Sequence, residues 1–438
     1  MTLRLDYSDP TFNTQYDAFL SNKRESDTDV RDLVSNIIAD VKTRGDEALL
    51  ELTEKFDRFD ARDKGLAISP ADVDAAIASL DPDLMTALEH AADRIKAYHS
   101  QQIPAGFDHM DGAGVRVGER WGPVDAVGLY VPGGLANYPS SVLMNALPAT
   151  VAGVKRLVMT VPTPDGVISP VVLAAARLAG VTEIYRVGGA QAVAALAFGT
   201  ETIDPVATIV GPGNAFVAEA KRQVFGQVGI DTIAGPSEIL IIADGDNKPD
   251  WIAADLLSQA EHDTVAQSIL ITTDKSFADQ VAWAVDSHLE TLPKADIARE
   301  AWTTYGAIIT VPDLETAAML SDRVAPEHLE LAVADPDALM AKITHAGAIF
   351  LGRLTPEALG DYIAGPNHVL PTARRARFSG GLSVYNFMKR TSFVGATVRG
   401  ISAIGPDAAR LARAENLDAH RLSVEIRLND KDLDQYDD

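Results

Sequence analysis

The sequence contains no cysteine among its 438 residues. Disulfide bonds are therefore excluded, and any zinc site must use nitrogen and oxygen ligands, which rules out zinc ribbons and thiolate chemistry. Long apolar runs are also missing, since none approaches the ~20 residues needed to cross a bilayer. The first residues, MTLRLDYSDPTF, have neither the basic start nor the apolar segment of a secretory signal. We therefore expect a cytoplasmic protein with no membrane partner.

Positive charge is scarce as well. The chain has 38 Lys and Arg residues against 62 Asp and Glu residues, which gives a formal net charge of -24. This balance argues against binding to nucleic acid or to an anionic membrane surface, and it leaves small molecules as the expected partners. With 47% hydrophobic and 23% charged residues, the composition is that of a folded protein, and its length suggests about two to four domains.

The N-terminal part, from about residue 26 to 102, has a helical pattern. Apolar residues recur every three or four positions in VRDLVSNIIADVKTRGDEALLELTEKF and again in DPDLMTALEHAADRIKAYHSQQ. Asp81 and Pro82 are a typical start for the second of these helices. Neither stretch has an obvious chemical constellation.

From Pro123 onwards, apolar strands alternate with helical runs. The four predicted strands lie in DAVGLYVPGG, RLVMTVPT, EIYRVGGA and ATIVGPGN, and each is followed by a helical pattern. This alternation predicts a mainly parallel sheet with helices on its faces. The loops PGG, VGGAQ and GPGN either turn the chain or let an anion such as a pyrophosphate approach the backbone. No G-x-G-x-x-G motif is present, so a conventional dinucleotide fold is not directly supported.

A second α/β unit is predicted after Gly235-Pro236-Ser237, with strands in EILIIAD, QSILITTD and GAIITV. The helix after the first of them carries Gln259 and His262. These residues are three apart, so on a helix they share one face and can present two metal-binding atoms together. The ordinary alternative is a histidine that is hydrogen-bonded to its neighbours.

Two further groups of polar residues have both a chemical and a plain structural interpretation. Glu327 and His328 are adjacent, which would point them about 100° apart on a helix, whereas on a loop they could converge as a base and its water-activating partner. Asp361 could equally cap a helix. The helical run AARLARAENLDAHRLSVEIRL carries Glu415 and His420, and such a small last unit is expected to pack on another subunit or on the main body.

Eight segments, in order over nearly the whole chain, resemble histidinol dehydrogenase: LYVPGGLANYPSSVLMNALPA, RVGGAQAVAALAFGTE, VGPGNAFVAEAKRQV, DTIAGPSEILIIAD, DLLSQAEHD, APEHLEL, GDYIAGPNHVLPT and ENLDAHRLSVEIR. The resemblance implies an α/β fold with two incomplete Rossmann-like parallel-sheet units and small helical N- and C-terminal segments. The expected parts are residues 1–122 (N-terminal helical region and start of the first α/β unit), 123–236 (Rossmann-like NAD-side unit), 237–379 (second α/β unit with metal and catalytic residues) and 380–438 (small C-terminal unit). The last part is expected to be swapped in a homodimer with shared active sites.

The resemblance also implies an activity, namely the zinc-dependent, NAD-linked oxidation of L-histidinol through L-histidinal to L-histidine, the last step of histidine biosynthesis. One zinc ion per subunit would orient the substrate. Its expected ligands are Gln259, His262, Asp361 and His420. By the same resemblance His328 is the base that takes the hydroxyl proton, and Glu327 activates water at the aldehyde stage.

The remaining site residues come from the same resemblance. Tyr130, Gln191 and Asn214 are expected to bind NAD. The substrate would be contacted by the metal ligands and by Ser237, His328 and Glu415.

A basic cluster, Arg374, Arg375 and Arg377, leaves an alternative open. It is either a solvated loop or a site for an anion, and relatives of the family oxidise a sulfonated propanediol. A zinc- and NAD-dependent dehydrogenase of another small polar alcohol is therefore the alternative within enzymes. A non-catalytic homologue and a zinc hydrolase are the other interpretations.

Overall fold

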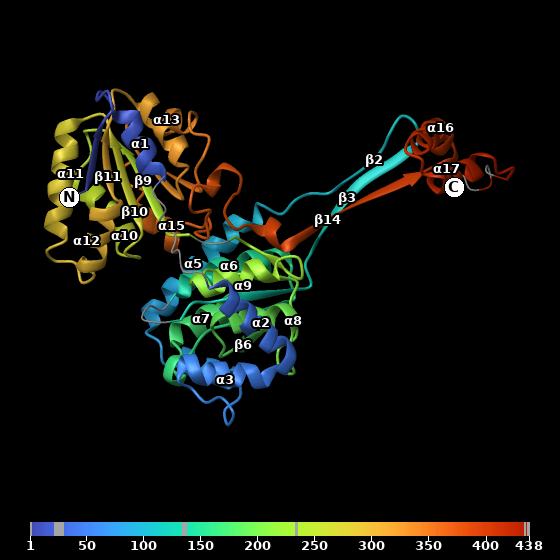
Figure 1. Cartoon of the computed structure of the whole chain (residues 1–438), viewed down its shortest axis with the longest axis horizontal. Helices are drawn as coiled ribbons and strands as arrows, with labels where there is room; N and C mark the ends of the chain where they lie inside the picture. Colours follow the sequence, from blue (N-terminus) through green and yellow to red (C-terminus); the bar gives the residue numbers. More distant parts are fainter. Residues whose placement is uncertain (1, 22–29, 134–137, 233–234, 433–434, 436–438) are drawn as a thin grey trace. The chain divides into compact units, whose positions relative to one another are not determined.

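The computed structural model describes residues 2–21, 30–133, 138–232, 235–432 and 435. The chain forms two compact units. The first comprises Met1–Gln102 and Val124–Phe387, and the second comprises Ile103–Pro123 and Met388–Asp438. Figure 1 labels their helices and strands.

The first sheet of the large unit has five parallel strands in the order β6-β5-β4-β7-β8. Their bounds are β4 Ala126–Tyr130, β5 Arg156–Thr160, β6 Glu183–Tyr185, β7 Thr208–Val210 and β8 Gly229–Ile230. Neighbouring strands are joined by helices, so both faces are covered, and β4 is buried along its whole length. The order of pairing reverses between β4 and β7, and the crevice at the carboxyl ends of such a pair is where open α/β sheets bind ligands.

Helices cover this sheet on both faces (Figure 1). The crossover helices are α6 Pro139–Ala152, α7 Pro170–Leu178, α8 Gly189–Phe198 and α9 Ala215–Val224. The N-terminal helices join these layers. Helices α2 Arg31–Arg44 and α3 Asp46–Asp57 share a core with α8 and α9, whereas α4 Pro70–Ala78 and α5 Pro82–Ser100 pack on α7 and α6. The predicted start of α5 is confirmed, because the Asp81 side chain accepts the Asp83 N–H and Pro82 follows it.

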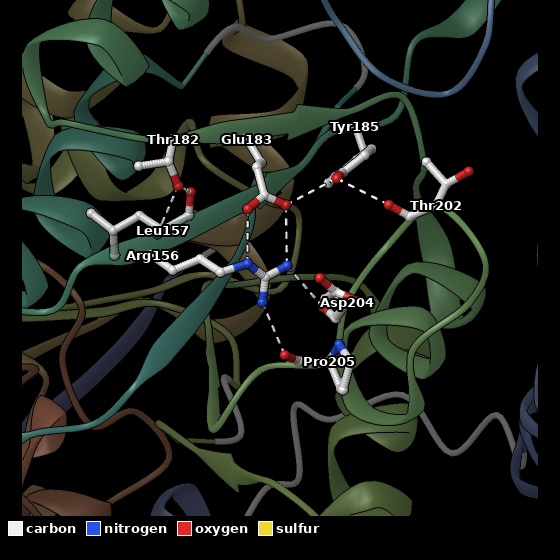
Figure 2. Close-up of polar contacts among 8 residues, drawn as sticks. All are labelled: Arg156, Leu157, Thr182, Glu183, Tyr185, Thr202, Asp204 and Pro205. Atoms are coloured by element: carbon white, nitrogen blue, oxygen red, sulfur yellow. Dashed lines mark hydrogen bonds and ion pairs between the residues drawn. The ribbon is translucent and has the colours of Figure 1, made fainter.

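The amino edge of the same sheet is held by an arginine (Figure 2). Arg156, the first residue of β5, makes two hydrogen bonds to the Glu183 carboxylate on β6. It also donates to the carbonyl groups of Asp204 and Pro205, just before β7. One half-buried guanidinium thus ties three strand starts together.

The second sheet has six parallel strands in the order β1-β11-β10-β9-β12-β13. The strands are β1 Leu3–Asp6, β9 Glu238–Ala243, β10 Gln267–Thr272, β11 Ala307–Thr310, β12 His328–Ala332 and β13 Ala348–Leu351. One face packs on α10 Pro249–Ala260, α11 Lys275–His288 and α12 Ala295–Tyr305, and the other on α1 Phe12–Ser21, α13 Leu314–Val324 and α14 Pro336–Met340. A further short helix, α15 Glu357–Tyr362, follows β13. The two parallel sheets with helices on both faces confirm the predicted α/β fold class.

The small unit consists of an antiparallel sheet and two helices. Its strands, in the order β14-β3-β2, are β2 Phe107–Met110, β3 Val115–Pro123 and β14 Met388–Ala396. The helices α16 Val398–Ala414 and α17 Asp418–Leu428 pack closely at Gly405, where an added Cβ would lie 3.2 Å from atoms of Val424 and Leu428.

The prediction of a helix running through residues 408–428 is wrong at its middle. Helix α16 ends at Ala414, and Asn416 has a φ of 59°. The Leu417 N–H then bonds to the Ala412 carbonyl, which closes the helix with the left-handed cap that asparagine tolerates. Glu415 therefore lies in the turn between two helices, and His420 lies on the second helix.

Among the described helices, none has both the length and the apolar character that crossing a bilayer requires.

Candidate functional site

A cavity of about 440 Å³ lies in the large unit and contains most of the predicted site residues. It opens at the carboxyl end of β7 and at the amino ends of β9 and β12. The polar side chains that line it are Tyr138, Ser140, Ser141, Asn214, Lys221, Asp231, Thr232, Ser237, Gln259, His262, Asp263, Glu327, His328, Glu357, Asp361, Tyr362, His368 and Thr372.

The adjacent residues Glu327 and His328 are both held by the backbone of Glu238, the first residue of β9. The Glu238 N–H donates to Glu327 Oε2 at 2.9 Å, and the Glu238 carbonyl accepts a hydrogen bond from His328 Nδ1 at 3.0 Å. They are 5% and 4% exposed. A strand start, rather than a helix, therefore brings the acid and the imidazole together.

The hydrogen bond to Glu238 fixes the tautomer of His328. Because Nδ1 donates to a carbonyl, the lone pair of the neutral ring is on Nε2, which has no hydrogen-bond partner among the described residues. Nε2 lies 3.7 Å from Asp361 Oδ1, and Nδ1 lies 3.2 Å from Glu357 Oε1. Burial lowers the pKa of His328 to about 4, so its ring is neutral at pH 7 and can accept a proton.

Gln259 and His262 line the cavity from the end of α10, but not from one helix face as predicted. The helix ends at Ala260, and His262 lies in the turn that follows. The Glu261 N–H still bonds to Leu257, whereas the His262 N–H bonds to the Gln259 carbonyl, so the last turn is tighter than an α-helix. Gln259 is 1% exposed, and its Oε1 atom has no hydrogen-bond partner in the described part of the chain.

Helix α15 contributes Glu357, a residue that the sequence interpretation missed, together with Asp361. The two carboxylates are four residues apart and therefore lie on one helix face, which is the signal that could have identified Glu357. The ligand atoms of His328, Glu357 and Asp361 lie within 4.8 Å of one another. One imidazole and two carboxylates can hold a divalent cation, and they equally suit a base with acidic neighbours.

The carboxyl groups around α15 are unusually basic. Burial and the negative charge of neighbouring carboxylates raise the pKa values of Glu330 and Glu357 well above the ordinary value, and burial raises the pKa of Asp255 to about 6. His368 behaves in the opposite sense, since burial lowers its pKa. Its Nδ1 donates to the Asp361 carbonyl at 2.9 Å, which supports the helix end that carries Asp361.

The predicted NAD residues lie around the carboxyl edge of the first sheet. Tyr130 ends β4, and its hydroxyl accepts the Gly189 N–H at 3.2 Å, at the start of α8. Gln191 is buried within α8. Asn214 caps α9 by accepting the N–H groups of Phe216 and Val217, and it is the one of the three that lines the described cavity.

Two of the glycine loops have a packing reason for their glycines. A Cβ on Gly133 or Gly188 would lie 2.5 or 2.4 Å from the side chain of Pro162, so only glycine allows these loops to meet at that proline. Gly134 of the PGG loop lies outside the described residues.

Besides Tyr130 and Gln191, two further predicted groups lie outside the cavity lining, namely the pair Glu415 and His420 and the arginine cluster. Glu415 and His420 belong to the small unit and are exposed there. The arginine cluster forms a turn in which Ala373 and Arg374 have φ values of 52° and 63°, and none of its arginines is among the described residues that line the cavity.

Comparisons with known proteins agree over nearly the whole chain. The sequence model of the family described as histidinol dehydrogenase matches residues 20–428. Histidinol dehydrogenase of Rhodospirillum rubrum is 64% identical over 430 residues, which are 98% of this chain and 99% of the relative, and that of Ruegeria pomeroyi is 61% identical over 97% and 98%. The crystal structure of histidinol dehydrogenase from Elizabethkingia anophelis is 36% identical and superposes with a TM-score of 0.93 over 98% of both chains. This chain belongs to the histidinol dehydrogenase family and is an oxidoreductase.

Proposed function

We propose that this protein oxidises L-histidinol through L-histidinal to L-histidine, the last step of histidine biosynthesis, with two molecules of NAD and one zinc ion per subunit. The observation that carries the proposal is the buried pair of Glu327 and His328, held by the Glu238 backbone in a cavity that is also lined by nitrogen and oxygen groups of the kinds that bind zinc. A neutral imidazole beside a carboxylate suits the abstraction of a proton from an alcohol.

The donor set fits zinc. Gln259, His262 and Asp361 line one cavity, and the buried Gln259 Oε1 lacks a protein partner among the described residues, as a ligand atom would. These three residues, with His420 of a second subunit, would hold the ion. When bound, zinc would anchor and polarise the nitrogen groups of the substrate.

The residues of this chain supply the proton chemistry. His328 Nε2 takes the hydroxyl proton, because a neutral alcohol is a poor hydride donor. Glu327, fixed by the Glu238 N–H, orients and deprotonates the water that attacks the aldehyde stage. NAD would accept the hydride at each of the two stages.

Binding of NAD is supported by the first sheet. Its strand order reverses between β4 and β7, and Tyr130 and the GPGN loop with Asn214 lie at their carboxyl ends. The N-terminus of α9, which Asn214 caps, lies at the same edge, and the N-terminus of a helix favours a phosphate group.

A homodimer with shared sites is supported by the composition of the small unit. No residue of α17 is buried within the described chain, and α16 buries only Gly400, Gly405 and Ala409. Leu411 and Ile426 are 67% and 57% exposed. Such an apolar surface on a unit with almost no core favours a partner subunit. In this proposal residues 380–438 carry Glu415 and His420 into the neighbouring active site.

No observation favours the sulfonated alternative. Among the described residues that line the cavity, Lys221 is the only lysine or arginine, and its ammonium group is paired with Asp231. A sulfonate would require a free cation there.

The test uses purified, zinc-loaded protein and L-histidinol, with NADH counted per substrate consumed. We expect two NADH per histidinol, loss of activity with a chelator and recovery with zinc. His262→Ala should lose both zinc and activity, whereas His328→Ala should keep zinc and lose turnover by roughly 10²-fold or more. His90→Ala, an exposed histidine on α5, is the matched control and should change neither. Full zinc content and activity in both site variants would contradict the assignment.

A further inference from the structure

The GPGN loop is held by a buried ion pair that has no part in the chemistry described above. Gly211 is the first residue after β7. Its N–H donates to Asp231 Oδ2 at 2.8 Å, and its carbonyl accepts from Lys221 Nζ at 3.1 Å. Lys221 and Asp231 also pair with each other, and each side chain is 3% exposed. One residue is thus fixed at both of its backbone polar groups by two opposite charges.

The surroundings of Gly211 leave it little freedom. Its φ of 117° suits glycine alone, and a Cβ at this position would lie 2.0 Å from the Tyr130 carbonyl oxygen. The Gly211 backbone is therefore pressed against the end of β4. Asn214, three residues later, both caps α9 and lines the cavity. A rotation about Gly211 would move Asn214 and the first N–H groups of α9.

A buried ion pair is a weak device for stability, because removing two charges from water offsets much of their attraction. We propose that Lys221 and Asp231 are positioning residues that hold the GPGN loop in the shape that binds the dinucleotide. Lys221 comes from the last turn of α9, and Asp231 follows β8, so the pair ties the end of this helix and the neighbouring strand end to the GPGN loop that precedes the helix. The inference rests on the proposed binding of NAD at this edge of the sheet.

The test compares Lys221→Met, Asp231→Asn and the double variant by calorimetric titration with NAD, by steady-state kinetics and by thermal unfolding. Each single variant should raise the Kd for NAD roughly tenfold or more, because a backbone partner or the paired charge is lost. At saturating NAD, kcat and the KM for histidinol should stay within about twofold, since the catalytic pair is untouched.

The double variant separates positioning from stability. It contains no unpaired buried charge, so its melting temperature should rise above those of the single variants. Its NAD affinity should remain low, because the Gly211 carbonyl still lacks its donor. A double variant that regains both its melting temperature and its NAD affinity would overturn the proposal. Single variants with unchanged NAD affinity would also overturn it.

Arg156→Met is the matched control. Arg156 forms an ion pair with Glu183 in the same sheet, but at the opposite, amino edge (Figure 2). This variant should lower the melting temperature and leave the Kd for NAD unchanged, whereas an equal loss of NAD affinity would show that any weakening of the sheet has the same effect. A wild-type protein that does not bind NAD would contradict the proposed function, which is distinguishable from these outcomes.

Discussion

Asp255, Glu330 and Glu357 form a cluster of carboxyl groups, of which Glu357 Oε1 lies 3.2 Å from His328 Nδ1. Glu330 and Glu357 are 3% and 2% exposed, and no lysine or arginine is among the causes that shift their pKa values. Burial raises the pKa of all three groups, and the negative charge of neighbouring carboxylates raises the pKa values of Glu330 and Glu357 further. The free-energy cost of keeping these carboxyl groups together in the folded chain therefore depends on pH. Unfolding measurements at several pH values can determine it.

Asp255 gives the clearest pH prediction. Its pKa is raised from 3.8 to about 6, so the folded chain binds the proton more tightly than the unfolded chain. Stability should therefore fall as the pH rises from about 3.8 to about 6. Asp255→Asn should remove this slope and be more stable than the wild type at pH 7 by about 1–2 kcal/mol. Urea unfolding at several pH values measures this dependence of stability on pH.

Asp286→Asn is the control for this experiment, because Asp286 is an exposed acid on α11. It should leave the slope unchanged. If Asp255→Asn retained the full slope between pH 4 and 6, the buried position of Asp255 would not be the cause.

At the scale of elements, the sequence predicted most of what depends on local pattern. Continuous apolar runs such as EILIIAD became fully buried parallel strands, because both faces of such a strand are covered. Helix ends were less predictable: the turn at His262 and the break at Asn416 depend on individual backbone hydrogen bonds. Strand β1 was missed, since its four residues form a strand only by pairing with β11, about 300 positions away.

The short helix α15 shows how distant elements set the site. Its N-cap residue, Pro356, offers no side-chain cap, and the Glu357 N–H instead donates to Glu330 Oε1 on β12 at 2.7 Å. Glu330 and His328 are two residues apart on one strand and so point to the same face. The strand that carries His328 therefore also anchors the helix that carries Asp361. No local pattern indicates this contact.

Removal of that anchor should loosen α15. Glu330→Leu should destabilise the protein by about 1–3 kcal/mol, because the buried Glu357 N–H loses its acceptor. It should also lower zinc affinity through Asp361. Glu330→Gln keeps an acceptor oxygen and removes the cost of ionising a buried carboxyl group, so its stability at pH 7 should equal or exceed that of the wild type. Thermal unfolding and zinc titration measure both effects, and equal behaviour of the two variants would contradict the anchoring role.

At the scale of the whole molecule, the two units differ in how many of their apolar residues they bury. The large unit has extensive buried cores, whereas the helices of the small unit expose their apolar residues. No pattern in the sequence links His420 to Gln259 and His262, 158 or more positions earlier. That link came only from the family resemblance, because no local spacing in the sequence relates positions so far apart.

The proposed sharing of sites between subunits predicts complementation between two inactive variants. His420→Ala and His328→Ala should each be inactive alone. In a mixed dimer with swapped tails, one site combines the intact His328 of one subunit with the intact His420 of the other. Equal mixing makes half of the dimers mixed, so activity should return to about a quarter of the wild-type value. The measurement is NADH formation after subunit exchange, with exchange verified by mass spectrometry.

Mixing His328→Ala with His262→Ala is the matched control. Both residues lie in the cavity of the large unit, so every site in the mixed dimer lacks one of them and activity should not return. Without swapping, the first pair of variants should fail in the same way, because each intact His328 would face its own altered tail. Proven exchange without recovery would therefore place His420 in the active site of its own subunit or in none.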